Sequence, residues 1–213
     1  MKRNKLFLLG LFVVFAAVLS LSLVSSTFAK YVTTESGSDK ARVAKWGVVI
    51  EADALTVFKD EYDGTVKGTS SEKVVAPGTA GSLANLGITG TPEVKVEVKY
   101  TATLTLTGWT VDGADYCPLE ITVGTTTYKI GTNPTDAVDI DDLISKVEAA
   151  IAAYTKEYGV NTDLSSADAP EVSWAWAFTG NDNAKDTKLG DVAAAGSAPI
   201  IKLDITCTVT QID

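Results

Sequence analysis

Few side chains in this 213-residue chain can act as nucleophiles, general bases or metal ligands. The chain has no histidine, so Ser-His-Asp and Cys-His catalysis and His-Glu-x-x-His zinc sites are excluded. No phosphate-binding glycine loop is present, because Gly78, Gly81, Gly87 and Gly90 are spaced irregularly and are more typical of turns. These residue types predict a protein that is not an enzyme, with no catalytic residues and no cofactor.

The carboxylates gather in two clusters, residues 136–142 and residues 182–186. Carboxylate oxygens are ligands that calcium prefers, but neither cluster has the Asp-x-Asp-x-Asp-Gly spacing with a closing glutamate. A helix start accounts for the first cluster and a solvated loop for the second. We therefore expect no metal site. A glycosidase pair is defined by its separation in space, and no residue pair here indicates one.

Two cysteines, Cys117 and Cys207, are compatible with one disulfide in an oxidising compartment or with two buried thiols. Each cysteine is in phase with apolar residues two positions apart on its own segment, so both side chains should face the core. Pairing requires that the two strands bring their Cα atoms within about 7 Å of each other. The pattern favours a structural role for both thiols over catalysis or metal binding.

Strict alternation of apolar and polar residues predicts a long half-buried strand from Val94 to Thr107. The same period predicts strands at residues 46–50, 55–58, 119–123, 128–130, 172–178 and 201–209, and Gly124–Thr127 is a plausible hairpin connection. Each strand has one apolar face to bury, which favours a two-sheet antiparallel sandwich. The aromatic strand at Trp174, Trp176 and Phe178 is expected in the core; exposed, it would be a sugar-stacking platform.

Two helices are expected to accompany the strands. The longer has apolar residues at helical spacing from Ile140 to Tyr158, with Thr135 or Asp136 as the cap and Gly159 at its exit. The shorter lies between Ala184 and Ala195, where Gly190 weakens it. Both are predicted to be packing elements rather than parts of a site.

The first 29 residues have the pattern of a secretory signal peptide. Lys2, Arg3 and Lys5 precede an apolar run, and a polar stretch ends at Ala29, where we expect cleavage. The alternative is a membrane anchor, because the apolar stretch can be extended to Val24. Cleavage predicts a secreted protein of the extracellular matrix or cell surface.

The mature chain is acidic. The whole chain has 18 Lys and Arg against 27 Asp and Glu, a net charge of −9, and loss of the three basic leader residues lowers this to −12. Nucleic acids and anionic lipid surfaces both require a basic face, so we expect neither as a partner. The length of the remaining chain favours one domain, residues 43–213, preceded by an arm at residues 30–42.

This arm is largely polar, and Ser36–Asp39 is not expected to form a core strand. It is compatible with a disordered terminus or with a segment that completes the sheet of a neighbouring molecule. In the second case Lys30 begins the arm, and Tyr31, Val32 and Val43 supply the apolar side chains that enter the neighbour. Repeated head-to-tail addition produces an open filament of identical copies.

Several short segments resemble the TasA/camelysin family of secreted Gram-positive biofilm-matrix proteins. They are Ser26–Tyr31, Ala41–Val48, Val75–Gly78, Asp186–Gly190 and Thr208–Gln211. The resemblance implies a jelly-roll sandwich with accessory helices and subunits that assemble into extracellular fibres. Camelysins are described as metal-dependent proteases, but the absence of histidine means that this activity is not transferred. The sequence thus predicts a structural fibre subunit; the alternative is a monomeric cell-surface binding module, for example for carbohydrate.

Overall fold

The computed structural model describes residue 4 and residues 9–16, 40–50, 57–69, 73–83, 87–180 and 182–213. The chain divides into two units, Met1–Arg42 and Val43–Asp213. In the first unit residues 9–16 are helical, and the expected cleavage point at Ala29 lies outside the described residues. None of the described helices has the length and apolarity needed to cross a membrane.

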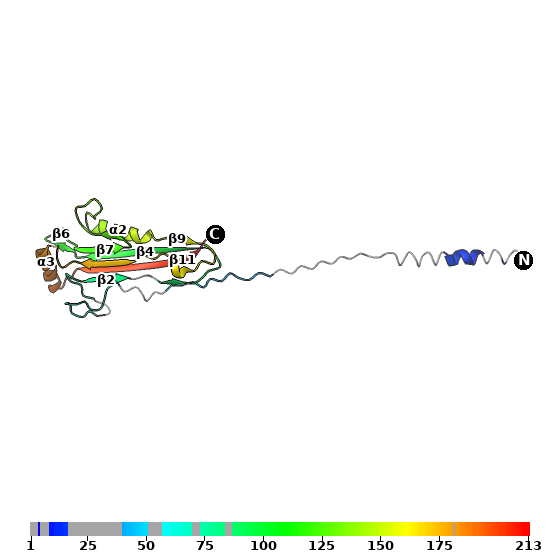
Figure 1. The fold of residues 1–213 in the computed structure, drawn as a ribbon, viewed down its shortest axis with the longest axis horizontal. Coiled ribbons are helices and arrows are strands. Elements are labelled where there is room, and N and C mark those ends of the chain that lie inside the picture. The colour runs from blue at the N-terminus through cyan, green and yellow to red at the C-terminus, as the bar shows by residue number, and fades with distance from the viewer. Residues whose placement is uncertain are drawn as a thin grey trace. The chain divides into compact units, whose positions relative to one another are not determined.

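The second unit is mainly β, with antiparallel pairing in every sheet, as predicted (Figure 1). A four-stranded sheet has the order β2 (Ala80–Leu83), β10 (Val172–Trp176), β7 (Leu119–Val123) and β8 (Thr126–Tyr128). A three-stranded sheet has the order β11 (Ile200–Gln211), β4 (Val96–Thr107) and β9 (Lys156–Tyr158). Two ribbons complete the set, β1 (Val49–Ile50) with β3 (Ile88–Thr89) and β5 (Thr110–Val111) with β6 (Ala114–Asp115).

The alternating pattern of β4 determines which of its faces is buried. Val96, Val98, Tyr100, Leu104 and Leu106 are buried, while the threonines between them are exposed. The strand starts two residues later than predicted, because Glu93 and Val94 form a bend. Its inner residues share one core with buried residues of the four-stranded sheet and of helix α2 (Ile140–Ala152).

Three tryptophans are in this core. Trp174 Nε1 donates a hydrogen bond to the Val57 carbonyl at 3.1 Å, and Trp109 meets Trp176 edge to face with ring centroids 5.4 Å apart. Gly81 is required opposite Trp174, since a Cβ there would lie 2.6 Å from Trp174 Nε1. The core assignment of Trp174 and Trp176 is therefore confirmed. Phe178 was wrongly included, because it lies beyond the end of β10 and is 73% exposed.

The predicted long helix is shorter than its apolar pattern. Asp139, rather than Thr135 or Asp136, caps α2 by accepting a hydrogen bond from the Asp142 amide at 2.8 Å. The helix ends at Ala152, and Tyr158 belongs to β9, which pairs with the start of β4. Strand pairing thus overrides helical periodicity here, and Gly159 is not the helix exit.

The remaining differences concern lengths. Helix α3 (Asn183–Ala194) has 12 residues against 13 in α2, so the predicted contrast of a long and a short helix is wrong. A 3-10 turn, η2 (Leu164–Ser166), was not anticipated. The hairpin turn between β7 and β8 contains only Gly124 and Thr125. Val57 and Phe58 lie outside any strand, and Leu55 is outside the described residues.

Candidate functional site

Strand β11 has one long edge with no partner strand within the described part of the chain. It pairs with β4 over all 12 of its residues, from Ile200 opposite Thr107 to Gln211 opposite Val96. No described strand lies on its other side. At about 3.3 Å per residue this edge is about 40 Å long. An edge of this length presents a row of backbone donors and acceptors to any extended chain.

The inner face of β11 is apolar and incompletely covered. Ile201, Leu203, Cys207 and Val209 are half-buried, and Ile205 is 5% exposed. On the neighbouring β4, Val98 and Tyr100 are fully buried. The apolar face of the sheet is therefore less buried at β11, its last strand, than at β4. One more strand beside β11 would extend this face and cover it further.

Charged residues on β11 are confined to its outer face. Lys202 and Asp204 form an ion pair with 2.6 Å between nitrogen and oxygen, and both are exposed. Natural edge strands are often protected by a charge that points inward, and β11 has none. The opposite edge of its sheet is protected: β9 covers the start of β4, and Glu148 of α2 accepts a hydrogen bond from the Leu104 amide at 2.9 Å.

Tyr100 and Cys207 face each other across β4 and β11. The Tyr100 side chain is fully buried, and among the described residues its hydroxyl has no hydrogen-bond partner of normal geometry. Burial and the neighbouring Cys207 thiol raise the pKa of Tyr100, and burial raises the pKa of Cys207. Both groups are therefore neutral at physiological pH. A neutral hydrogen-bonding group is a more favourable neighbour for them than a charged one.

The two cysteines are free thiols. Both face the core as their phase predicts, but Cys207 is opposite Tyr100 in the three-stranded sheet, whereas Cys117 precedes β7 in the four-stranded sheet. Cys117 is 5% exposed, and burial raises its pKa to about 12. A buried thiol with so high a pKa is not a nucleophile at neutral pH.

Of the four predicted arm residues, the structure describes one. Val43 is 92% exposed and precedes β1, whereas Lys30, Tyr31 and Val32 lie outside the described residues. Near Val43 the chain is fixed by reciprocal hydrogen bonds of 2.9 Å, from the Lys45 amide to the Glu93 carboxylate and from the Glu93 amide to the Lys45 carbonyl. This anchor lies beside the start of β4, where β11 ends.

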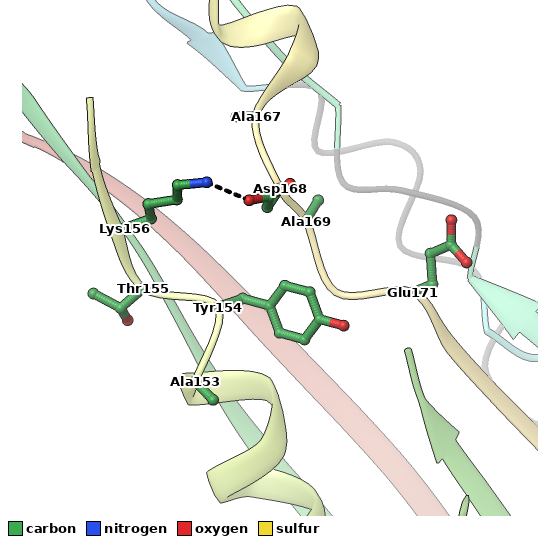
Figure 2. Close-up of a pocket in the computed structure, with 8 residues that line it drawn as sticks. All are labelled: Ala153, Tyr154, Thr155, Lys156, Ala167, Asp168, Ala169 and Glu171. Atoms are coloured by element: carbon green, nitrogen blue, oxygen red, sulfur yellow. Dashed lines mark hydrogen bonds and ion pairs between the residues drawn. The ribbon is translucent and has the colours of Figure 1, made fainter. Parts of the chain in front are cut away.

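A separate cavity of about 380 Å³ lies between residues 153–156, which lead into β9, and residues 167–171, which lead into β10 (Figure 2). The Lys156 ammonium and the Asp168 carboxylate are 2.6 Å apart, and Figure 2 shows the Tyr154 ring directed toward the Glu171 side of the cavity. Asp168 raises the pKa of Lys156, so this amine stays protonated. Sequence reasoning missed the cavity because its two walls share no motif and are brought together by the intervening β9 and η2 segment.

The described residues contain no group of three or more His, Cys, Asp or Glu side chains that could hold a metal ion. Comparisons of the chain with protein-family models, with curated proteins and with solved structures gave no match. The observations define the class only as a mainly β protein with one long open edge strand.

Proposed function

We propose that this protein is a secreted structural subunit of an extracellular fibre or biofilm matrix. Its fold is proposed to be a two-sheet antiparallel sandwich of jelly-roll type, and its copies assemble non-covalently, head to tail. The arm at residues 30–42 of one copy adds a strand to the next copy. The observation that carries this proposal is β11, a long edge with an apolar and half-covered inner face.

The length of the arm supports this pairing. Residues 30–42 number 13, and in extended form they reach about 43 Å at about 3.3 Å per residue. The open edge of β11 has 12 residues, or about 40 Å. The arm is therefore long enough to pair with the entire edge, and backbone hydrogen bonds of this kind supply affinity in strand addition.

The position of the anchor at Lys45 and Glu93 favours one direction of pairing. The anchor at Lys45 and Glu93 lies where β11 ends, because Ile212 donates a backbone hydrogen bond to Lys95 at 3.0 Å and Gln211 is opposite Val96. In a head-to-tail row, the arm reaches the next copy at the end where β11 begins, near Ile200. The C-terminal end of the arm then lies near Ile200 and its N-terminal end near Gln211. The arm therefore runs opposite to β11, so the pairing is antiparallel. This matches every other strand pair of the sheet.

Deletion of residues 30–42 from the mature protein tests the proposal. Electron microscopy should show filaments from the intact mature protein and none from the deletion variant. Circular dichroism should show near-normal β content, because the core of residues 43–213 keeps its own apolar faces. Val32→Pro should slow filament growth by removing one backbone donor, whereas Gly37→Ala is the matched control. Filaments that form at the normal rate without the arm would contradict strand donation.

The second candidate is a monomeric cell-surface module that binds carbohydrate. The cavity of Figure 2 favours it, since an aromatic ring beside carboxylates and hydroxyls suits a sugar. The tryptophan platform envisaged from the sequence is excluded, because Trp174 and Trp176 are 3% and 6% exposed. A glycan-binding screen with Tyr154→Ala as control tests this candidate. Monomeric wild-type protein that binds a glycan through Tyr154 would replace the fibre proposal.

A further inference from the structure

We propose that the arm of a second copy binds β11 in one phase and one register, with Val32 opposite Val209 and Thr34 opposite Cys207. The proposal rests on the proposed function and specifies its contact. Even-numbered arm residues then face the core, and odd-numbered residues face outward. This turns Tyr31 to the outer face and leaves Val43 beyond the paired segment.

The phase follows from the cost of burying charge. Val32, Thr34, Ser36 and Ser38 share one face of an extended arm with Lys30 and Lys40, and Glu35 and Asp39 lie on the other face. The two lysines lie at the ends of the paired segment, opposite Gln211 and Ile201, where a long side chain can extend past the strand to solvent. On the inner face of β11 a carboxylate would meet Ile201, Leu203 or Ile205, with no cation beside it. An unpaired charge in such a place is strongly unfavourable, so the carboxylates must face outward. Ser36, one of the smallest of these inward residues, then lies opposite Ile205, the most covered position of β11.

The register follows from the charges on the outer face. With Thr34 opposite Cys207, Asp39 lies opposite Lys202 and Gly37 lies opposite Asp204. A shift of two residues one way places Asp39 opposite Asp204, and the reverse shift places Glu35 opposite Asp204. Like charges directly opposite each other destabilise a strand pair, whereas opposite charges stabilise it. Larger shifts move Lys40 from the end of β11 to a place opposite Ile205, its most covered residue, or move Lys30 to a place opposite Cys207.

The polar side chains of Tyr100 and Cys207, which lie opposite each other on β4 and β11, agree with this register. The enclosed Tyr100 hydroxyl has no partner of normal geometry among the described residues, and Cys207 lies opposite it with its thiol half-buried. Thr34 would bring a neutral hydroxyl to Cys207 on the inward side. A neutral donor and acceptor at this point suits the neutral Cys207 thiol, whereas Val32 in its place would leave Cys207 without a polar neighbour on this side.

Cysteine cross-linking tests the phase. Directly opposite residues of an antiparallel pair have Cα atoms about 4.5–5.5 Å apart, within the range for a disulfide. Filaments of Thr34→Cys should form disulfides with the native Cys207 on mild oxidation and give a ladder of oligomers on a non-reducing gel. Thr33→Cys is the matched control, because the same substitution one residue earlier faces outward. Cys207→Ser should remove the ladder, and the triple variant Thr33→Cys, Cys207→Ser, Thr208→Cys should restore it.

A charge exchange tests the register without thiols. Asp39→Lys should slow filament elongation about two- to fivefold, the size of one cross-strand charge pair. Adding Lys202→Asp should restore the rate. A ladder from Thr33→Cys but not from Thr34→Cys would overturn the phase. Filaments with neither ladder would overturn β11 as the acceptor while leaving the fibre function intact, and wild-type protein without filaments would overturn the proposed function itself.

Discussion

Leu104 and Thr105 are neighbours in β4 with opposite environments. Leu104 is 4% exposed in the core, while Thr105 is exposed and opposite Lys202. Leu104→Asp should unfold the second unit, because it buries an unpaired carboxylate. Thr105→Asp should change the free energy of unfolding by less than about 1 kcal/mol, since its charge is solvated and faces a cation. Urea denaturation measures both, and equal losses would mean that β4 is covered on both faces.

The Cys117 thiol makes stability dependent on alkaline pH. Its pKa is raised from 9.0 to about 12 by burial, so from pH 9 upward the unfolded state releases a proton that the folded state retains. The free energy of unfolding should therefore be unaffected by this group below pH 9 and should fall as pH rises toward 12. The slope from one such group is at most about 1.4 kcal/mol per pH unit. Thermal unfolding at pH 8–10 should show a shallower decline in Cys117→Ala, and identical slopes would contradict a raised pKa.

Which side chains face inward could be predicted from sequence, because a strand alternates strictly between its faces. Val98, Leu104 and Cys117 were assigned correctly on that basis. Phe178 has the same phase as Trp176 but lies beyond the strand, where alternation no longer has a meaning. The missing hydrogen bond of the buried Tyr100 hydroxyl could not be predicted, because it depends on which side chains the neighbouring strands place beside that hydroxyl.

At the scale of elements, the start of α2 depends on Asp139. Its carboxylate accepts a hydrogen bond from the Asp142 amide, which would otherwise lack a partner within the helix. Asp139→Ala should lower the free energy of unfolding by about 1 kcal/mol. Asp141→Ala is the matched control, because Asp141 stabilises the helix dipole alone and should cost only about 0.3–0.5 kcal/mol. Chemical denaturation compares the two, and equal losses from both would contradict Asp139 as the cap.

The places of the helices and strands along the chain were largely predictable, but which strand lies at the edge of a sheet was not. The pattern at residues 201–209 indicated a strand without showing whether it lies inside a sheet or at its margin. That depends on which strand it pairs with, and the pairing of β11 with β4 joins residues about a hundred positions apart. The candidate site consists largely of this edge, so its place in the fold became clear only from the topology.

Helix α2 protects one margin of the three-stranded sheet. Glu148 accepts a hydrogen bond from the Leu104 amide on the side of β4 that faces away from β11. A helix and a short strand thus cover one margin of the three-stranded sheet. The other margin has only outward charges, Lys202 and Asp204. This asymmetry is expected of a sheet with one margin closed and one that receives a partner.

At the scale of the whole molecule, the donor and the acceptor of the proposed assembly are different surfaces of one chain. Such a contact is heterologous, and its repetition extends a row of copies instead of closing a dimer. The sequence suggested the proposed donor, a polar arm after the expected leader, and it gave no sign of the proposed acceptor. The proposed assembly would also cover Cys207, so we expect this residue to be alkylated more slowly in filaments than in monomers.

A peptide with the sequence of residues 30–42 should bind the protein that lacks its own arm. A ligand that binds only the folded state stabilises it by mass action, by about 2.7 kcal/mol at one hundred times its dissociation constant. The melting temperature of the arm-deleted protein should therefore rise with peptide concentration, and Cys207 should become protected from alkylation. The matched control is the same peptide with Val32→Pro, which loses one backbone donor to the edge and should bind more weakly.

Added to intact protein, the native peptide should occupy β11 and stop filament growth. A peptide that stabilises the protein but leaves Cys207 reactive would show that it binds at another edge, and one that has neither effect would contradict strand donation.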